Sequence, residues 1–264
     1  MPFVELNNIV HRYLDEGAKE KPAIVFANSL GTDLRIWDEI AARLSHDCRI
    51  VRYDKRGHGL TDAVSPPYAA ADLAKDVVRL LDLLDISQAV ICGVSVGGVI
   101  AQALALNQPA RVRALILSDT GARIGSIESW RQRIETIEAG GVRSIEQMTM
   151  ERWFSASFRA RQPADIRGYS NMLLQTSAQG YVGTCCALRD ADFRSVAGRV
   201  KCPTLVLTGA EDIATPPALG RELASSIPGA HFSLIEGAGH LPCIEQPIAM
   251  ANRILEFLRE VQIV

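Results

Sequence analysis

The chain contains one serine in a setting that favours nucleophilic chemistry. Ser95 lies in Gly93-Val94-Ser95-Val96-Gly97, between the apolar run Val90–Cys92 and the Ala- and Leu-rich stretch 99–106. A strand followed by a tight turn and a helix would expose the hydroxyl at the turn, and the two glycines would let strand and helix pass closely. The pattern Gly-x-Ser-x-Gly therefore predicts a nucleophile, with a plain glycine-rich turn as the alternative.

A serine nucleophile requires a base, because its hydroxyl is a poor nucleophile at neutral pH. Of the five histidines, His240 alone follows the last predicted strand, in the glycine-rich loop Glu236-Gly237-Ala238-Gly239-His240. We therefore predict His240 as the base. We expect His11 and His46 to be exposed and His58 to belong to a structural turn.

Two aspartates could orient that histidine. Asp119 and Asp212 each follow a predicted strand, and either satisfies the chain order serine, acid, histidine. We favour Asp212, because Gly209 begins a loop that can turn the carboxylate toward the His240 loop on the neighbouring strand. Asp119 remains the rival, and its expected role is to hold the hinge of the segment that follows it.

Acyl transfer at Ser95 would also need two donors for the tetrahedral oxyanion. One predicted donor is the backbone N–H of Val96, which follows the nucleophile. The other is the backbone N–H of Leu30, in the loop Asn28–Asp33 after the third predicted strand. Since both donors are backbone groups, this prediction concerns position more than side-chain identity.

The elements that must position these residues alternate between strand and helix. Two alternating stretches, Phe3–Leu6 and Ile9–Leu14, are joined at Asn7-Asn8 and predict an antiparallel hairpin at a sheet edge. Together with the later strands, this predicts an α/β fold with a mostly parallel eight-stranded sheet flanked by helices, whose ligands bind at the carboxyl ends of the strands. The later strands are expected at 23–27, 49–53, 90–92, 114–117, 203–207 and 231–235.

The alternation stops after Asp119. Residues 121–194 show only helical patterns, and their basic residues are all arginine. We predict a core domain formed by residues 1–120 and 195–264, and a helical cap, or lid, inserted as residues 121–194. The substrate is expected to bind beneath this cap.

Composition excludes several classes of protein. The 264 residues are 48% hydrophobic and carry a net charge of -2, with no basic runs that would indicate nucleic-acid binding. The chain shows neither a signal-peptide pattern nor an apolar stretch long enough for a membrane helix, so we expect a cytoplasmic protein with no membrane partner. The six cysteines lack metal-site spacing and are expected to be free thiols, mostly buried.

With these residues assembled, the chain resembles the α/β-hydrolase superfamily over essentially its whole length, and within it the 3-oxoadipate enol-lactonases. The likeness lies in Asn28–Asp33, DKRGHGLTD at 54–62, ERWFS at 151–155, CCALRDADFR at 185–194 and IEQP at 244–247. The resemblance implies hydrolysis of a small anionic lactone in aromatic catabolism, with no cofactor and no metal. Val96 departs from the Met or Gln that often follows the nucleophile in relatives.

The implied substrate carries a free carboxylate, and helix geometry ranks the cap arginines as its ligand. On a helix over about Glu128–Glu138, Arg131 has acids three residues before and four after it, so we expect surface ion pairs there. Arg133 has no such partner and lies at the edge of the apolar face, beside Trp130. We predict Arg133 as the carboxylate ligand, Arg152 and Arg123 as rivals, and Trp130 and Trp153 as further substrate contacts.

Other functions stay open at this point. The same triad serves general short-chain carboxylesterases and C–C bond hydrolases, because one fold hosts several chemistries. A ligand receptor that keeps the triad but turns over slowly belongs to a different class. The oligomeric state cannot be derived from the sequence.

Overall fold

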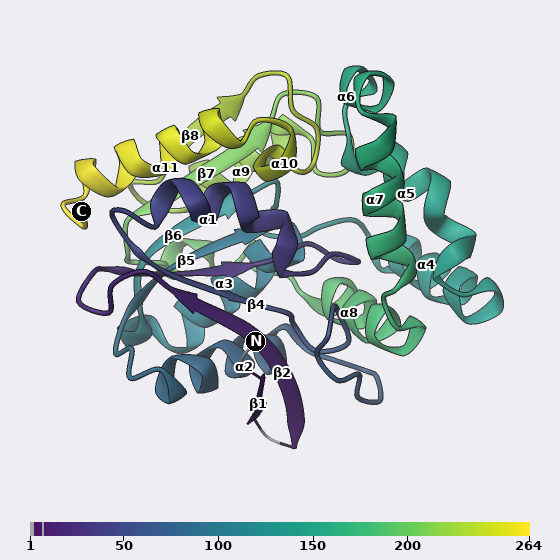
Figure 1. Ribbon diagram of the computed structural model, residues 1–264, viewed down its shortest axis with the longest axis horizontal. Coiled ribbons are helices and arrows are strands. Elements are labelled where there is room, and N and C mark those ends of the chain that lie inside the picture. The colour runs from purple at the N-terminus through teal and green to yellow at the C-terminus, as the bar shows by residue number, and fades with distance from the viewer. Residues whose placement is uncertain (1–2, 7) are drawn as a thin grey trace.

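The computed structural model describes residues 3–6 and 8–264, and within these ranges the strands form a single sheet (Figure 1). The sheet has eight strands in the order β1-β2-β4-β3-β5-β6-β7-β8. The pairs β1–β2 and β2–β4 are antiparallel and the other pairs are parallel, which confirms the predicted mostly parallel sheet. The strands are β1 (Phe3–Leu6), β2 (Ile9–Glu16), β3 (Ala23–Ala27), β4 (Arg49–Tyr53), β5 (Ala89–Val94), β6 (Val112–Ser118), β7 (Thr204–Gly209) and β8 (His231–Ile235).

The edge hairpin is present, with Leu6 opposite Ile9. Asn8 has φ 60°, and Asn7, the other residue of the predicted turn, lies outside the described residues. β2 runs on to Glu16, two residues beyond the predicted end at Leu14, because its second half pairs with β4 up to the partners Glu16 and Ile50. The contact with a strand far along the chain determines this end.

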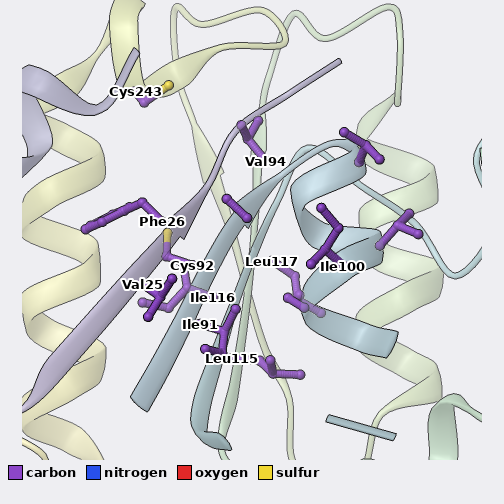
Figure 2. Close-up of a cluster of buried hydrophobic side chains, with 14 of the residues drawn as sticks. Val25, Phe26, Ile91, Cys92, Val94, Ile100, Leu115, Ile116, Leu117 and Cys243 are labelled. Atoms are coloured by element: carbon purple, nitrogen blue, oxygen red, sulfur yellow. The ribbon is translucent and has the colours of Figure 1, made fainter. Parts of the chain in front are cut away.

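The central strands are buried on both faces, as parallel strands covered by helices must be. β3, β5 and β7 are buried at every position. Figure 2 shows side chains of β3, β5, β6 and α3 meeting in this core, including Val25, Ile91, Leu115 and Ile100. The six cysteines are free, and all but Cys202 are buried, as predicted.

Helices cover both faces of the sheet (Figure 1). α1 packs against α11 on one face, and α2 packs against α3 on the other. Among the described residues, no helix is both long and apolar enough to cross a membrane. The helices of this layer are α1 (Asp38–Leu44), α2 (Ala70–Leu83), α3 (Val96–Asn107), α9 (Pro217–Ser226), α10 (Pro242–Glu245) and α11 (Pro247–Glu260).

Between β6 and β7 the described backbone forms helices and no strand. Most of them stand together at one end of the molecule, on the right in Figure 1. They occupy the stretch that we predict as a cap, and the cap boundaries at 121 and 194 stay a prediction. These helices are α4 (Ile127–Gly140), α5 (Glu146–Trp153), α6 (Ala156–Arg161), α7 (Pro163–Leu174) and α8 (Ala178–Asp190).

Candidate active site

Ser95 forms the turn between β5 and α3, at the carboxyl end of the sheet. Its backbone has φ 58° and ψ −118°, a conformation that residues other than glycine rarely adopt. Neighbouring backbone and side chains hold this strained residue in place, because Ser95 N donates to Ser118 O at 2.9 Å and Thr120 Oγ1 donates to Ser95 O at 2.8 Å. Such strain at a turn is common where a side chain must be presented for chemistry.

The two glycines of the motif are required by contact. A Cβ on Gly93 would lie 2.2 Å from the carbonyl carbon of Gly97, and one on Gly97 would lie 2.0 Å from Ala27 O. Both distances are far inside van der Waals contact with backbone atoms, so larger residues would push strand and helix apart. The close passage expected from the sequence pattern is present.

Asp212 and His240 meet at the ends of β7 and β8. His240 Nδ1 lies 2.8 Å from Asp212 Oδ2, and both side chains are almost fully buried. The same carboxylate accepts hydrogen bonds from Thr215 Oγ1 at 2.6 Å and from the backbone N–H groups of Ala214 and Thr215. Because a carboxylate only accepts, the Nδ1 proton belongs to this bond and Nε2 is left as the basic nitrogen.

These donors control the charge of the acid. Burial alone would raise the pKa of Asp212, but the neighbouring His240 and the hydrogen bonds from His240 and Thr215 outweigh it and lower the pKa below its usual range. Asp212 is therefore ionised at neutral pH. A buried anion next to the ring can stabilise the imidazolium that forms when His240 takes a proton.

The loop that carries His240 is bonded to the last residue of α5 and to the segment that follows it. His240 N donates to Trp153 O at 2.9 Å. The carboxylate of Glu245 accepts from Gly239 N at 2.7 Å and from Ser155 N and Oγ at 3.1 and 2.6 Å. These bonds fix the position of His240 relative to Trp153, which lines the same cavity.

The two predicted oxyanion donors both have unused N–H groups. In the part of the chain that the structure describes, the Leu30 N–H makes no hydrogen bond to a protein acceptor. Val96 is the first residue of α3, where an N–H has no carbonyl in a preceding turn, and the helix N-terminus favours negative charge. These groups can serve as the donors that a tetrahedral oxyanion needs.

Ser95, His240 and Leu30 line one cavity of about 150 Å³, which suits a small substrate. In the described structure Ser95 Oγ makes no hydrogen bond, and a nucleophile and its base often come into bonding distance only when substrate binds. The other wall comes from the predicted cap. Its lining residues include Trp130, Arg133, Thr149, Arg152, Trp153 and Tyr181.

A strained serine, a buried acid–histidine pair and two free backbone donors around one cavity are typical of serine hydrolases. A family model described as the alpha/beta hydrolase fold matches residues 22–247. This chain belongs to the α/β-hydrolase family.

Its relatives include lactonases and an esterase. The chain is 36% identical over 247 residues to 3-oxoadipate enol-lactonase 2 of Acinetobacter baylyi, covering 94% of this chain and 92% of that one. The crystal structure of the enol-lactonase from Burkholderia xenovorans LB400 superposes with a TM-score of 0.95 at 37% identity, covering 98% of this chain and 100% of that one. A thermophilic esterase from Thermogutta terrifontis, solved with malate bound, has a TM-score of 0.91 at 28% identity, covering 96% and 94%.

Two arginines of the hydrolase line the cavity, and within the described residues neither forms an ion pair with a carboxylate. Arg133 interacts electrostatically with Tyr181, Cys185 and Arg152. Arg152 lies 3.5 Å from Ala214 O, and Asp212 interacts favourably with its charge without forming an ion pair with it. Burial and then the charge of Arg133 lower the pKa of Arg152. The rival Arg123 is paired with Asp192 at 2.9 Å and does not line this cavity.

Arg131 corrects one expectation. It is exposed on α4, but it forms no ion pair with Glu128 or Glu135, although the spacing predicts both. Glu128 is also exposed and its pKa is lowered first by backbone and Ser126 hydrogen bonds, with Arg131 contributing less. Exposed pairs of this kind gain little in water, which explains why the side chains stay apart.

Asp119, the rival acid, is bonded to the neighbouring strand. Its carboxyl accepts from Gly209 N at 2.8 Å and from Ser118 Oγ at 2.5 Å, and the first of these bonds ties the end of β6 to β7, while the expected role at the cap hinge stays a prediction. Burial and then the charge of Asp212 raise its pKa well above the usual range. Although Asp119, Asp212 and His240 offer atoms within 4.8 Å of one another, it is Asp212 that accepts the hydrogen bond from His240 Nδ1.

The other histidines are placed as expected except for one. His46 is exposed, and His58 is buried in a turn with Nδ1 at 3.2 Å from Arg56 O. The prediction that His11 is exposed is wrong. It is only 2% exposed because β2 faces α2 there, with its ring 3.6 Å from Asp76.

Sequence reasoning missed three polar groups of the site. Thr215 donates to Asp212, Thr149 lines the cavity with a buried hydroxyl that has no partner in the structure, and the buried Tyr181 lies beside Arg133. The Asp212-x-x-Thr215 spacing could have indicated the contact of Thr215, because an aspartate side chain often accepts hydrogen bonds from residues two or three positions later in a turn. The other two carry no local signal.

Proposed function

We propose that this hydrolase opens the lactone ring of 3-oxoadipate enol-lactone to 3-oxoadipate, a step of the β-ketoadipate pathway, through an acyl-enzyme on Ser95. The observation that carries this proposal is the pair Arg133 and Arg152, which line the cavity of Ser95 and, within the described residues, form no ion pair with a carboxylate. A lactone with a free carboxylate supplies the missing negative charge. The names of the relatives support the same ring chemistry.

Acylation starts from the neutral histidine. Ser95 Oγ attacks the lactone carbonyl carbon while His240 Nε2 takes its proton, and the Leu30 and Val96 N–H groups receive the oxyanion. The ring C–O bond then breaks, and His240 returns the proton to the departing enol oxygen. The acyl group stays on Ser95, and the enol becomes the 3-oxo group.

Deacylation repeats these steps with water. His240 takes a proton from water, whose oxygen attacks the acyl carbon, and the second tetrahedral species collapses with the proton returned to Ser95 Oγ. Asp212 keeps His240 in the tautomer that has Nε2 free throughout. We propose that residues 121–194 act as the cap that shields these steps, with Trp130 and Trp153 against the ring.

The runner-up function is a general short-chain carboxylesterase. The structural similarity to the Thermogutta terrifontis esterase favours it over a C–C hydrolase or a receptor. An esterase of broad range would need no charge in the acyl pocket, so neutral aryl esters would be hydrolysed at least as well as the anionic lactone.

The turnover experiment separates these functions. Purified protein is incubated with the enol-lactone, with p-nitrophenyl acetate and with a C–C hydrolase substrate, and product per enzyme is counted. We expect many turnovers of the lactone at about 1 to 10³ per second, the common enzyme range. Product that stops at one equivalent would support the receptor, and preference for the neutral ester would support the esterase.

Arg133→Leu tests the carboxylate ligand. Loss of a charge-assisted bond should lower kcat/KM for the anionic lactone about 10- to 100-fold and leave the neutral ester little changed. Arg131→Leu, the same change on the exposed face of α4, is the matched control and should alter neither substrate. An equal loss on both substrates would indicate a cap defect, and no loss would move the role to Arg152.

A further inference from the structure

A buried lysine lies behind the loop that carries Leu30. Lys55 follows β4 and is 1% exposed. Its Nζ donates to the carbonyl oxygens of Ser29 at 2.5 Å and Thr32 at 3.3 Å. Within the described residues it forms no ion pair, because the nearby carboxylates have other donors: Asp33 binds Arg35, and Asp54 accepts from the backbone.

Burying an ammonium on two carbonyls is unfavourable unless something else is gained. Hydrophobic packing does not require a charge at this position. The proposed catalytic steps do not use this residue directly, since Lys55 is not among the cavity-lining residues, whereas Ser29 and Leu30 are.

The position of its acceptor explains the charge. Ser29 C=O and Leu30 N–H belong to the same peptide unit, and this unit is trans. In a planar trans peptide the two groups point in opposite directions. A donor that fixes the Ser29 carbonyl from behind therefore aims the Leu30 N–H away from Lys55, and hydrogen bonding at one end of a peptide polarises the other.

We propose that Lys55 is a positioning residue for the reaction: its ammonium orients and polarises the Ser29–Leu30 peptide, so that the Leu30 N–H becomes a stronger oxyanion donor. The proposal rests on the proposed acyl-enzyme chemistry at Ser95. Thr32 contributes to the same carbonyl through N at 3.3 Å and Oγ1 at 3.0 Å, and these neutral donors fix its direction without charge.

The stronger Leu30 N–H donor is expected to stabilise the transition state more than the bound substrate. The oxyanion carries full negative charge only after Ser95 attacks, so a stronger donor lowers that barrier more than it improves substrate binding. It also acts on any carbonyl in the site, whether or not the substrate is anionic. This distinguishes the role of Lys55 from that of Arg133.

Lys55→Met removes the charge and keeps an unbranched chain of similar length. We expect kcat to fall about 10- to 100-fold on both the lactone and p-nitrophenyl acetate, with KM changed less than about threefold, since one full oxyanion donor is worth about 10²- to 10³-fold. Phenylboronic acid, which mimics the tetrahedral species on Ser95, should lose affinity by a similar factor.

Thr32→Val is the matched control, because it removes a neutral donor from the same carbonyl. We expect it to change kcat less than about threefold. Equal losses in Thr32→Val and Lys55→Met would show that loop order alone matters and would overturn the proposal. An unchanged kcat in folded Lys55→Met, or a loss confined to KM, would also overturn it.

The pH dependence of kcat distinguishes an effect of the Lys55 charge from an effect of loop order, because loop order does not change when Lys55 loses its proton. Burial lowers the pKa of Lys55 to about 7, opposed by the charges of Asp54 and Asp33. The adjacent His58 is held neutral, since burial and then Lys55 lower its pKa well below the usual range. The wild-type to Lys55→Met ratio of kcat should therefore be largest below about pH 7 and shrink above it, where the neutral amine still donates but carries no charge.

Two safeguards keep the experiment decisive. Lys55→Gln retains a neutral donor, and the same measurements on it decide the question if Lys55→Met does not fold. The neutral ester and the boronic acid need no carboxylate site, so they test Lys55 even if the lactone assignment fails. A ratio that is constant with pH would leave no role for the charge.

Discussion

Replacing Ser95 by alanine should abolish nearly all hydrolysis while leaving the protein folded. We expect kcat to fall by roughly 10⁶-fold, the loss seen when a triad serine is removed, with the remainder supplied by the oxyanion donors and binding. Alanine has the same strain at φ 58° as serine, so the unfolding temperature should change little. The measurement is kcat on the lactone and on p-nitrophenyl acetate.

The control is Ser225→Ala, which removes an exposed serine on α9 whose hydroxyl donates only to Arg221 O. It should keep wild-type activity. A serine-reactive phosphonate should modify Ser95 in the wild type and leave the Ser95→Ala variant unmodified. Activity of Ser95→Ala within about tenfold of wild type would remove Ser95 from the mechanism.

Asp212→Asn should be the second largest loss, about 10⁴-fold in kcat. An amide can donate to His240 Nδ1, and that bond favours the tautomer whose proton is on Nε2, where the base is needed. Asp119→Asn is the matched variant and should cost less than about tenfold, because the raised pKa of Asp119 favours a neutral carboxyl that asparagine resembles.

The two variants are compared by kcat at neutral pH after folding has been checked by circular dichroism. A larger loss in Asp119→Asn would transfer the orienting role to that residue. Equal large losses would mean that the two carboxyls act as one unit, since they lie close together at the ends of β6 and β7.

The sequence alone predicted the fold and the identity of the main candidate residues, for local reasons. Gly93 and Gly97 are needed because the strand and the helix pass so closely here, so the motif itself indicates this local geometry. Alternating strand and helix patterns specify a parallel sheet, and its carboxyl ends must share one edge. Ser95, Asp212 and His240 were therefore expected together without knowledge of any contact.

Where the local signal was ambiguous, the sequence could only rank alternatives. The chain order allowed Asp119 or Asp212 as the acid, and Arg123, Arg133 or Arg152 as the anion ligand. In the structure Asp212 is bonded to His240 and Arg123 is paired with Asp192, whereas Arg133 and Arg152 both line the cavity. These choices depend on distances between residues far apart in the chain.

Only the tertiary structure decided the features that arise between elements. His11 is buried because α2 covers it, Tyr181 of α8 reaches Arg133 of α4, and Lys55 after β4 reaches the loop after β3. Periodicity within one element records which face is apolar, but it carries no information on which polar group of another element will lie opposite. Burial, pairing and polarisation at this site are properties of those contacts, and for that reason they become visible only in the folded chain.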